Sequence, residues 1–354
     1  MVKIALLGDI SFNTDLAQKK PGSWKLFTGE IENHLNQADI IIFNLESPVT
    51  GSGPENQLKW PRLKTKEMAV DNLDFSGTTV AVLANNHAYD CLVDGYKNTV
   101  KALSSRNILS LGAGLSLEDA AKPVIIKKKG IAIGVLAYNA ASTNPSVPPE
   151  ADFYINELEE KKVIREIRCL KQKTDVLIVY CHWGVDYFEY PTPGQRAFAM
   201  KMADAGAKIV FGAHPHVIQG WEKYRGNFIF YSSGNTCFGN DEAIENGPKN
   251  RRSLTAFFRI STGKGLYLEK LCFMIRSIDG LNVSSLNGKK QESLKPLCWP
   301  LSLDKKAYYS FFKRKVLIDS LFFKPFNFFF GPDRNFPEQI KKIRPSHFKK
   351  LIYP

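Results

Sequence analysis

Short apolar runs that stop abruptly at small polar residues recur along the first 240 residues. Each run holds a handful of apolar, partly β-branched residues and then meets Asp, Asn, Glu, His or Ser. Such runs are typical of buried strands, because they are apolar on both faces and too short for a helix. The runs are KIALLGD, DIIIFNLE, TTVAVLANNH, DVLIVYCHWG, AKIVFGAHPH and FIFYSSGN.

Segments with helical spacing lie between these runs. Strands that alternate with helices predict an α/β layered sheet. Two antiparallel pairs are also expected, one within 123–138 and one formed by SLTAFFRIS and LYLEKLCFMIRS, whereas the Pro- and Ser-rich segment 141–154 reads as a loop. The expected helices are 22–37, 90–106, 156–172 and 193–205.

Polar residues that can bind metal gather where these strands end. The carboxyl ends of strands in such sheets are where ligands bind, and imidazole, carboxylate and amide groups together suit divalent Mn, Zn or Fe. Cys181 should point to the opposite side of its strand from His182, so thiolates are not part of the pattern. The residues concerned are Asp9, Glu46, Asn86, His87, His182, His214 and His216.

Each of these residues also has a structural interpretation. Asp9 could cap a turn, Glu46 could lie on a surface loop, and His182 could be a hydrogen-bonded core histidine. Asn85 and Asn86 could form an Asx turn, a role we expect for Asn85. The pair His214-Pro215-His216 is harder to explain structurally, because two imidazoles around a rigid proline make a compact chelating loop. Their occurrence together favours a metal site.

The composition narrows the partners and the compartment. A surplus of 48 basic over 35 acidic residues favours an anionic partner. The six cysteines are scattered without a CxxC pair, so we expect reduced, buried thiols. The first residues already read as a strand and no apolar run reaches about 18 residues, so neither a signal peptide nor a membrane-spanning helix is expected. These features predict a cytoplasmic protein.

The C-terminal part differs in character from about residue 280 onward. Residues 301–354 carry twelve Lys and Arg against four Asp and Glu, interleaved with Phe and Tyr. A helix over 306–323 would place Tyr309, Phe312, Val316 and Phe323 near one face. This face either contacts the anionic inner face of a membrane or a membrane synthase, or it packs back onto the body. Nucleic acid is not an expected partner, because no binding motif accompanies the charge.

The ordered motifs GDI, NLESP, LANNHAYD, GAG, HWG, GAHPHVIQ and YSSGN resemble the bacterial capsule synthesis protein CapA family. That family is associated with poly-γ-glutamate synthesis and belongs to the calcineurin-like metallophosphatase superfamily. The resemblance covers roughly residues 2–240. It implies a metallophosphatase-like α/β fold, a two-sheet sandwich flanked by helices, over 1–280. A basic, aromatic-rich extension would follow over 281–354.

The resemblance also implies roles for single residues. Glu46 would span two metals, and His87 would be left free as the acid beside the substrate, oriented by Asp90. Ser11 stands where the phosphatase pattern has a histidine, which removes one ligand from the first metal. The implied metal ligands are Asp9, Glu46, Asn86, His182, His214 and His216.

Three further residues are candidates for substrate binding. Arg62 and Lys64 could hold an anionic group, with a solvated loop as the alternative, and Asn235 could line the pocket or serve a turn. We therefore expect a hydrolase or transferase with one or two divalent metal ions, acting in capsule or exopolymer synthesis. Its substrate would be an anionic polymer or a phosphorylated small molecule. The alternative is a non-catalytic scaffold or polymer-handling subunit of a membrane-associated synthase.

Overall fold

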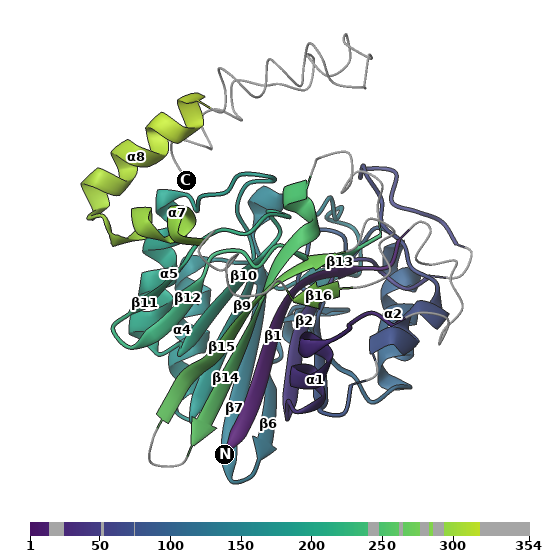
Figure 1. Ribbon diagram of the computed structural model, residues 1–354. Coiled ribbons are helices and arrows are strands. Elements are labelled where there is room, and N and C mark those ends of the chain that lie inside the picture. The colour runs from purple at the N-terminus through teal and green to yellow at the C-terminus, as the bar shows by residue number, and fades with distance from the viewer. Residues whose placement is uncertain are drawn as a thin grey trace.

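Two β-sheets face each other and helices cover their outer sides, as predicted (Figure 1). The computed structural model describes residues 1–13, 25–50, 53–73, 75–239, 248–261, 265–276, 283–285 and 294–318. Strands and helices alternate along most of the chain. The polar residues at the strand ends therefore belong to two sheets that pack against a shared core.

The first sheet has the strand order β16-β15-β14-β1-β2-β3-β4, with β13 beside the end of β1. Strands β1 to β4 are parallel, and β14 and β15 form the predicted antiparallel pair. The bounds are β1 (Val2–Ser11), β2 (Ile40–Leu45), β3 (Thr78–Val82), β4 (Leu109–Leu111), β13 (Asn235–Phe238), β14 (Arg252–Ser261), β15 (Gly265–Arg276) and β16 (Val283–Ser285).

The second sheet has the order β11-β12-β10-β9-β7-β6. Its four central strands are parallel, and the predicted hairpin within 123–138 forms the β6–β7 edge. The bounds are β6 (Val124–Lys128), β7 (Ile131–Asn139), β9 (Val176–His182), β10 (Ile209–Ala213), β11 (Trp221–Tyr224) and β12 (Asn227–Phe230). A separate small sheet pairs β5 (Ala113–Gly114) with β8 (Tyr154–Ile155).

Strand β9 shows how alternation divides the core. Ile178 and Tyr180 belong to the cluster between the sheets, and the Tyr180 hydroxyl donates to the carbonyl oxygen of Leu7 on β1 at 2.7 Å. Val179 and Cys181 belong to the cluster beneath the helices instead. The thiol of Cys181 therefore lies away from the strand-end histidine, as expected, and burial raises its pKa.

Four helices lie where the sequence predicts them, and three of them have shifted ends. Helix α5 (Pro193–Ala205) has the predicted bounds, because Thr192 and Gln195 form a capping box around Pro193. Helix α1 (Glu30–Asn36) begins later than residue 22: residues 25–29 are not helical, and residues 22–24 lie outside the described residues. The other two are α2 (Leu92–Ser104) and α4 (Glu160–Lys171), and the short α3 (Leu117–Ala121) was not predicted.

The described C-terminal residues pack onto the body. Helices α7 (Lys295–Cys298) and α8 (Lys305–Ile318) lie over the α5 side of the molecule (Figure 1). Tyr308 and Phe312 are buried, and the Tyr308 hydroxyl donates to the carbonyl oxygen of Pro191 at 2.7 Å. The inward residue is thus Tyr308, whereas the predicted Tyr309 is half-buried. Of the two interpretations, packing onto the body holds for 305–318, while 319–354 lie outside the described residues.

The expected division at residue 280 falls between β15 and β16, which pair with each other in the first sheet. Residues 283–285 are thus part of the same sheet as β1. Within the described ranges, no helix is both long enough and apolar enough to cross a membrane.

Candidate metal centre

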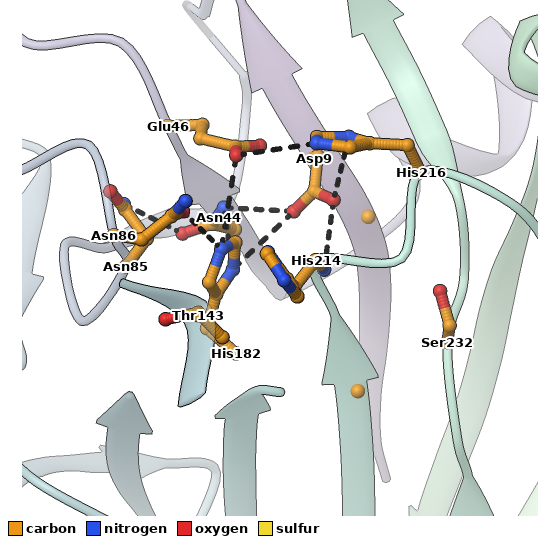
Figure 2. A network of polar contacts seen from close by, with 12 residues as sticks. Asp9, Asn44, Glu46, Asn85, Asn86, Thr143, His182, His214, His216 and Ser232 are labelled. Atoms are coloured by element: carbon orange, nitrogen blue, oxygen red, sulfur yellow. Dashed lines mark hydrogen bonds and ion pairs between the residues drawn. The ribbon is translucent and has the colours of Figure 1, made fainter. Parts of the chain in front are cut away.

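The predicted metal-binding residues meet at the carboxyl ends of the central strands (Figure 2). Asp9 lies on β1 and Glu46 follows β2, while His182 ends β9 in the opposite sheet. The turns after β3 and β10 supply the remaining residues. All are buried: Asp9, Glu46, Asn86, His87, His182, His214 and His216.

Backbone geometry around these residues is unusual for their type. His214 and His216 have φ values of 97° and 57°, in the left-handed region that non-glycine residues seldom adopt. Such strain is characteristic of functional sites, where the surrounding structure holds the residue in place. At position 8 only glycine fits, because a Cβ there would lie 2.1 Å from the carbonyl oxygen of Gly234. A bare backbone at Gly8 lets that turn approach Asp9.

Asp9 is held by two donors. Its Oδ1 accepts from Asn44 Nδ2 at 2.8 Å, and its Oδ2 accepts from the backbone N–H of His214 at 3.1 Å. Burial raises the pKa of Asp9, and the charge of His216 and these hydrogen bonds oppose that rise. The carboxylate is therefore fixed in orientation while it faces His216 Nδ1 at 3.9 Å.

Glu46 is the most exceptional side chain of the cluster. Its Oε1 lies 3.9 Å from His87 Nε2, and 3.8 Å from the Nε2 atoms of His182 and His216. The side chain is fully buried, and neither carboxylate oxygen has a hydrogen-bond partner among the described residues. Burial, followed by the charges of Asp9 and other acids, raises its pKa well above the ordinary value. Because an unpaired buried carboxylate costs several kcal/mol, a cation among these atoms fits the site.

The histidines are in the state that a metal requires. Burial lowers the pKa of His214 to about 4 and that of His182 well below its usual value, so both are neutral near pH 7. His182 Nε2 lies 2.8 Å from Asn86 Oδ1, which joins two predicted ligands. His214 Nδ1 is buried without a hydrogen-bond partner in the described part of the chain. A neutral nitrogen without a partner is ready to bind a metal ion.

Two overlapping groups of ligand atoms result from this arrangement. Asp9, Glu46 and His216 form one, and Asp186, His214 and His216 form the other, with atoms within 4.8 Å of one another in each. Carboxylates with imidazoles match the preferences of Mn, Zn and Fe. The described residues thus offer positions for one or two divalent ions.

His87 stands beside this cluster with its own carboxylate. His87 Nδ1 lies 2.6 Å from Asp90 Oδ2, so the orienting contact expected from the sequence is present. Asp90 Oδ2 also accepts from the backbone N–H of Leu63 at 2.6 Å. Burial lowers the pKa of His87, and Asp90 opposes that shift. Asn85 serves the turn, since its Oδ1 accepts from the His87 N–H at 3.0 Å.

The three expected substrate-binding residues have other partners. Arg62 and Lys64 both form ion pairs with Glu55. Asn235 Oδ1 lies 2.9 Å from His216 Nδ1, and Asn235 Nδ2 donates to the carbonyl oxygen of Asn250 at 3.1 Å. In this structure Asn235 therefore holds the imidazole of His216, one of the predicted metal ligands.

Sequence reasoning missed Asn44, Lys59 and Asp186 as part of the site. Asn44 lies on β2, two residues before Glu46, so the alternation of side chains along the chain could have placed both on the same side. Asp186 Oδ1 lies 3.3 Å from His214 Nε2. Asp186 and Lys59 reach the site through loops, for which the sequence carries no periodic signal.

Ser11, at the position where the phosphatase pattern has a histidine, has a hydrogen-bond partner of its own. It is fully buried, and its hydroxyl donates to Asn13 Oδ1 at 2.9 Å. Where the phosphatase pattern has an imidazole, this chain thus has a hydroxyl that donates to a residue two positions along the chain.

The chain is similar in sequence to capsule biosynthesis proteins of two Bacillus species. The chain is 32% identical over 251 residues to the PGA biosynthesis protein CapA of Bacillus subtilis, an alignment that covers 67% of this chain and 63% of that protein. It is 31% identical over 215 residues to the capsule biosynthesis protein CapA of Bacillus anthracis, covering 59% of this chain and 52% of that one. The chain therefore spans less than two thirds of the length of these relatives.

The NAD nucleotidase of Haemophilus influenzae aligns with a TM-score of 0.46 and 12% identity, over 90% of this chain and 60% of that one. Since this score is below 0.5, the fold description rests on the strand order itself. The family model for the bacterial capsule synthesis protein PGA_cap matches residues 3–240. The chain belongs to this bacterial capsule synthesis protein family.

Proposed function

We propose that this protein is a divalent-metal-dependent hydrolase or transferase of the phosphoesterase type, acting in capsule or poly-γ-glutamate synthesis. The observation that carries the proposal is the Glu46 carboxylate, buried among three imidazole nitrogens and without a hydrogen bond in the described structure. Family membership supports the setting. The anionic polymer, or a phosphorylated precursor of it, is the proposed substrate class.

The chain's own residues have distinct tasks in this mechanism. Asp9, Glu46, Asn86, His182, His214 and His216 would hold the metal. The chemistry that such an ion would supply when bound is polarisation of the phosphoryl or carbonyl oxygen and a lower pKa of water. Asp90 keeps a proton on His87 Nδ1 through the 2.6 Å contact and stabilises the imidazolium form. Only in this imidazolium form, which burial disfavours and Asp90 favours, does His87 Nε2 carry a proton, and from there it donates that proton to the leaving oxygen or nitrogen.

Metal content and turnover test this proposal together. Purified protein should contain one or two metal ions per chain by mass spectrometry, and His214→Ala should lower that content. The metal-loaded protein should hydrolyse an aryl phosphate or a γ-glutamyl polymer, and His87→Ala should remove most of this activity. A metal-free protein whose His87→Ala variant behaves as the wild type in every assay would exclude the enzyme.

A non-catalytic, polymer-handling role within a membrane-associated synthase is the second candidate. The observation that favours it is Ser11, which leaves the first metal position with one imidazole fewer. Under this proposal the protein binds polymer but turns nothing over. One metal ion per chain without turnover supports the scaffold, whereas two ions with turnover support the phosphatase mechanism.

A further inference from the structure

Lys59 is a buried cation beside the metal centre that the mechanism above does not use. We propose that Lys59 binds the anionic group of the substrate, a phosphate or a carboxylate, next to His87. This inference rests on the proposed function, because it assigns the residue that holds the substrate of that same site. It replaces Arg62 and Lys64 in that role.

The position of Lys59 is fixed relative to His87 by Asp90. The backbone N–H of Asn56 donates to the carbonyl oxygen of Asp90 at 2.8 Å, and that of Leu63 donates to the Asp90 carboxylate at 2.6 Å. Lys59 lies between these two anchors in the chain. Because the same carboxylate contacts His87, the segment 56–63 and the proposed acid share one support.

A second loop also contacts Lys59 and its segment. Its ammonium donates to the carbonyl oxygen of Asn144 at 2.6 Å, and Asn56 Nδ2 donates to the carbonyl oxygen of Ser146 at 2.9 Å. Lys59 is only 5% exposed. Lysine is almost never buried to this extent unless it is paired.

The pairing of Lys59 is incomplete in the described structure. No described carboxylate lies within ion-pair distance of its ammonium, which has three N–H donors and one assigned acceptor. The charges of Asp90, Glu46 and Asp186 act on Lys59 from farther away. A substrate anion would supply the missing acceptors.

The negative charge of the acidic residues at the centre explains why a cation is needed beside them. Asp9, Glu46, Asp90 and Asp186 gather there, so an anionic substrate meets repulsion unless cations offset it. The Lys59 ammonium acts on the metal-binding groups themselves: it opposes the rise in the pKa of Glu46 and lowers the pKa of His182 and His214. The geometry that brings Lys59 to the centre is its segment, which the Asn56 and Leu63 N–H groups hold to Asp90, the residue that contacts His87.

Lys64 is a matched control from the same segment. Its side chain is 61% exposed and its ammonium pairs with Glu55. Lys59→Met and Lys64→Met each remove one positive charge from the protein. A difference between the two variants would thus report position and not net charge.

The test is isothermal titration calorimetry of the metal-loaded full chain with inorganic phosphate and with glutarate. Lys59→Met should weaken binding of the anion that the wild type binds by about 10- to 100-fold. Lys59→Arg should retain most of the affinity, and Lys64→Met should match the wild type. Metal content should be the same in all four proteins. Lys59→Gln serves as a second neutral variant if Lys59→Met does not fold.

Two results would overturn the inference. One is equal anion affinity in the wild type and in the neutral Lys59 variants, and the other is a wild type that binds neither anion. Because titration needs no turnover, it separates this inference from the proposed function. An inactive wild type with Lys59-dependent anion binding refutes the hydrolase alone, and an active enzyme with Lys59-independent binding refutes the role of Lys59 alone.

Discussion

Two buried polar clusters in this protein differ in how their charges are satisfied. Beneath the C-terminal segment, Arg196 on α5 donates to Glu222 on β11 and to the carbonyl oxygens of Leu301 and Leu303. Its guanidinium also lies over the ring of Tyr308, 4.9 Å from the centroid. At the metal centre, by contrast, Glu46 is more deeply buried and accepts no hydrogen bond from the described residues.

This difference separates a structural network from a ligand site. A buried charge that folding alone must stabilise is given partners by the protein, because an unpaired one lowers stability by several kcal/mol. Arg196 meets that condition through contacts with three separate elements. Glu46 does not, although it is surrounded by nitrogens that could have donated to it. Under the proposed function a metal ion supplies the missing partner of Glu46, and the two clusters should then respond differently to mutation.

The largest effect is expected from Glu46→Gln on metal binding. Removing the charge that faces three imidazoles should lower metal affinity by more than the 10- to 100-fold typical of outer partners, about 1000-fold. The metal-free variant should be at least as stable as the metal-free wild type, since the change removes an unpaired buried charge and no hydrogen bond. Metal titration and urea unfolding measure the two quantities. Glu222→Gln is the control and should leave metal affinity intact.

Unchanged metal affinity in Glu46→Gln would break the comparison. It would mean that the carboxylate without a partner is an uncompensated cost of the fold and not a ligand. A large loss of stability in the metal-free variant would equally contradict the interpretation, because it would reveal a structural partner of Glu46.

The next effect concerns His87, at the edge of the unsatisfied cluster. His87→Gln should lower kcat for an aryl phosphate by about 100- to 1000-fold, because a positioned acid contributes this much to proton transfer. Metal content should stay at the wild-type value, since the assigned ligands are untouched. Loss of metal together with activity would instead make His87 a ligand.

The satisfied network should respond in stability. Arg196→Met should lower the free energy of unfolding by about 3 kcal/mol, because it leaves two backbone carbonyls without this donor and removes the cation paired with Glu222, which keeps the hydrogen bond from Tyr231. Metal affinity should not change. Arg225→Met is the matched control: Arg225 also pairs with an acid, Asp204, but its side chain is 71% exposed, so the expected change is below about 1 kcal/mol. Equal destabilisation by the two variants would contradict the assignment of Arg196.

Much of the metal centre could be predicted from the sequence, because parallel strands bring their carboxyl ends to one edge. Asp9, Glu46 and His182 each end or follow a strand whose apolar run is plain in the sequence. Once the strands are identified, their meeting follows from the geometry of the sheets. Strand alternation likewise directs Cys181 away from the site.

Other features depend on tertiary packing and could not be predicted. Asp186 and Lys59 lie on loops whose paths are set by distant contacts, such as the one between Lys59 and Asn144. Helix α8 carries aromatic residues at 308, 309, 311 and 312, so helical spacing alone does not decide which face is buried. The body decides it, through the acceptor that Pro191 offers to Tyr308.

Asp186 gives the smallest effect and the finest test of the comparison. Among the described residues His214 Nδ1 has no hydrogen-bond partner, while His214 Nε2 lies 3.3 Å from Asp186 Oδ1. If Nδ1 binds the metal, Asp186 holds the proton on Nε2, an arrangement in which a carboxylate fixes the tautomer of a metal-binding histidine. Asp186→Asn should then weaken metal binding by about 10-fold, since the Asp186 side chain is 56% exposed and partly screened by solvent.

Metal titration of Asp186→Asn and Asp186→Glu decides between the two roles of this residue. Asp186→Glu should restore part of the affinity, and the exposed Asp204→Asn should behave as the wild type. A loss as large as that of Glu46→Gln would instead make Asp186 a direct ligand, joined to His214 and His216 in the second group of ligand atoms. Wild-type affinity in Asp186→Asn would remove it from the site and leave His214 oriented by its strained backbone alone.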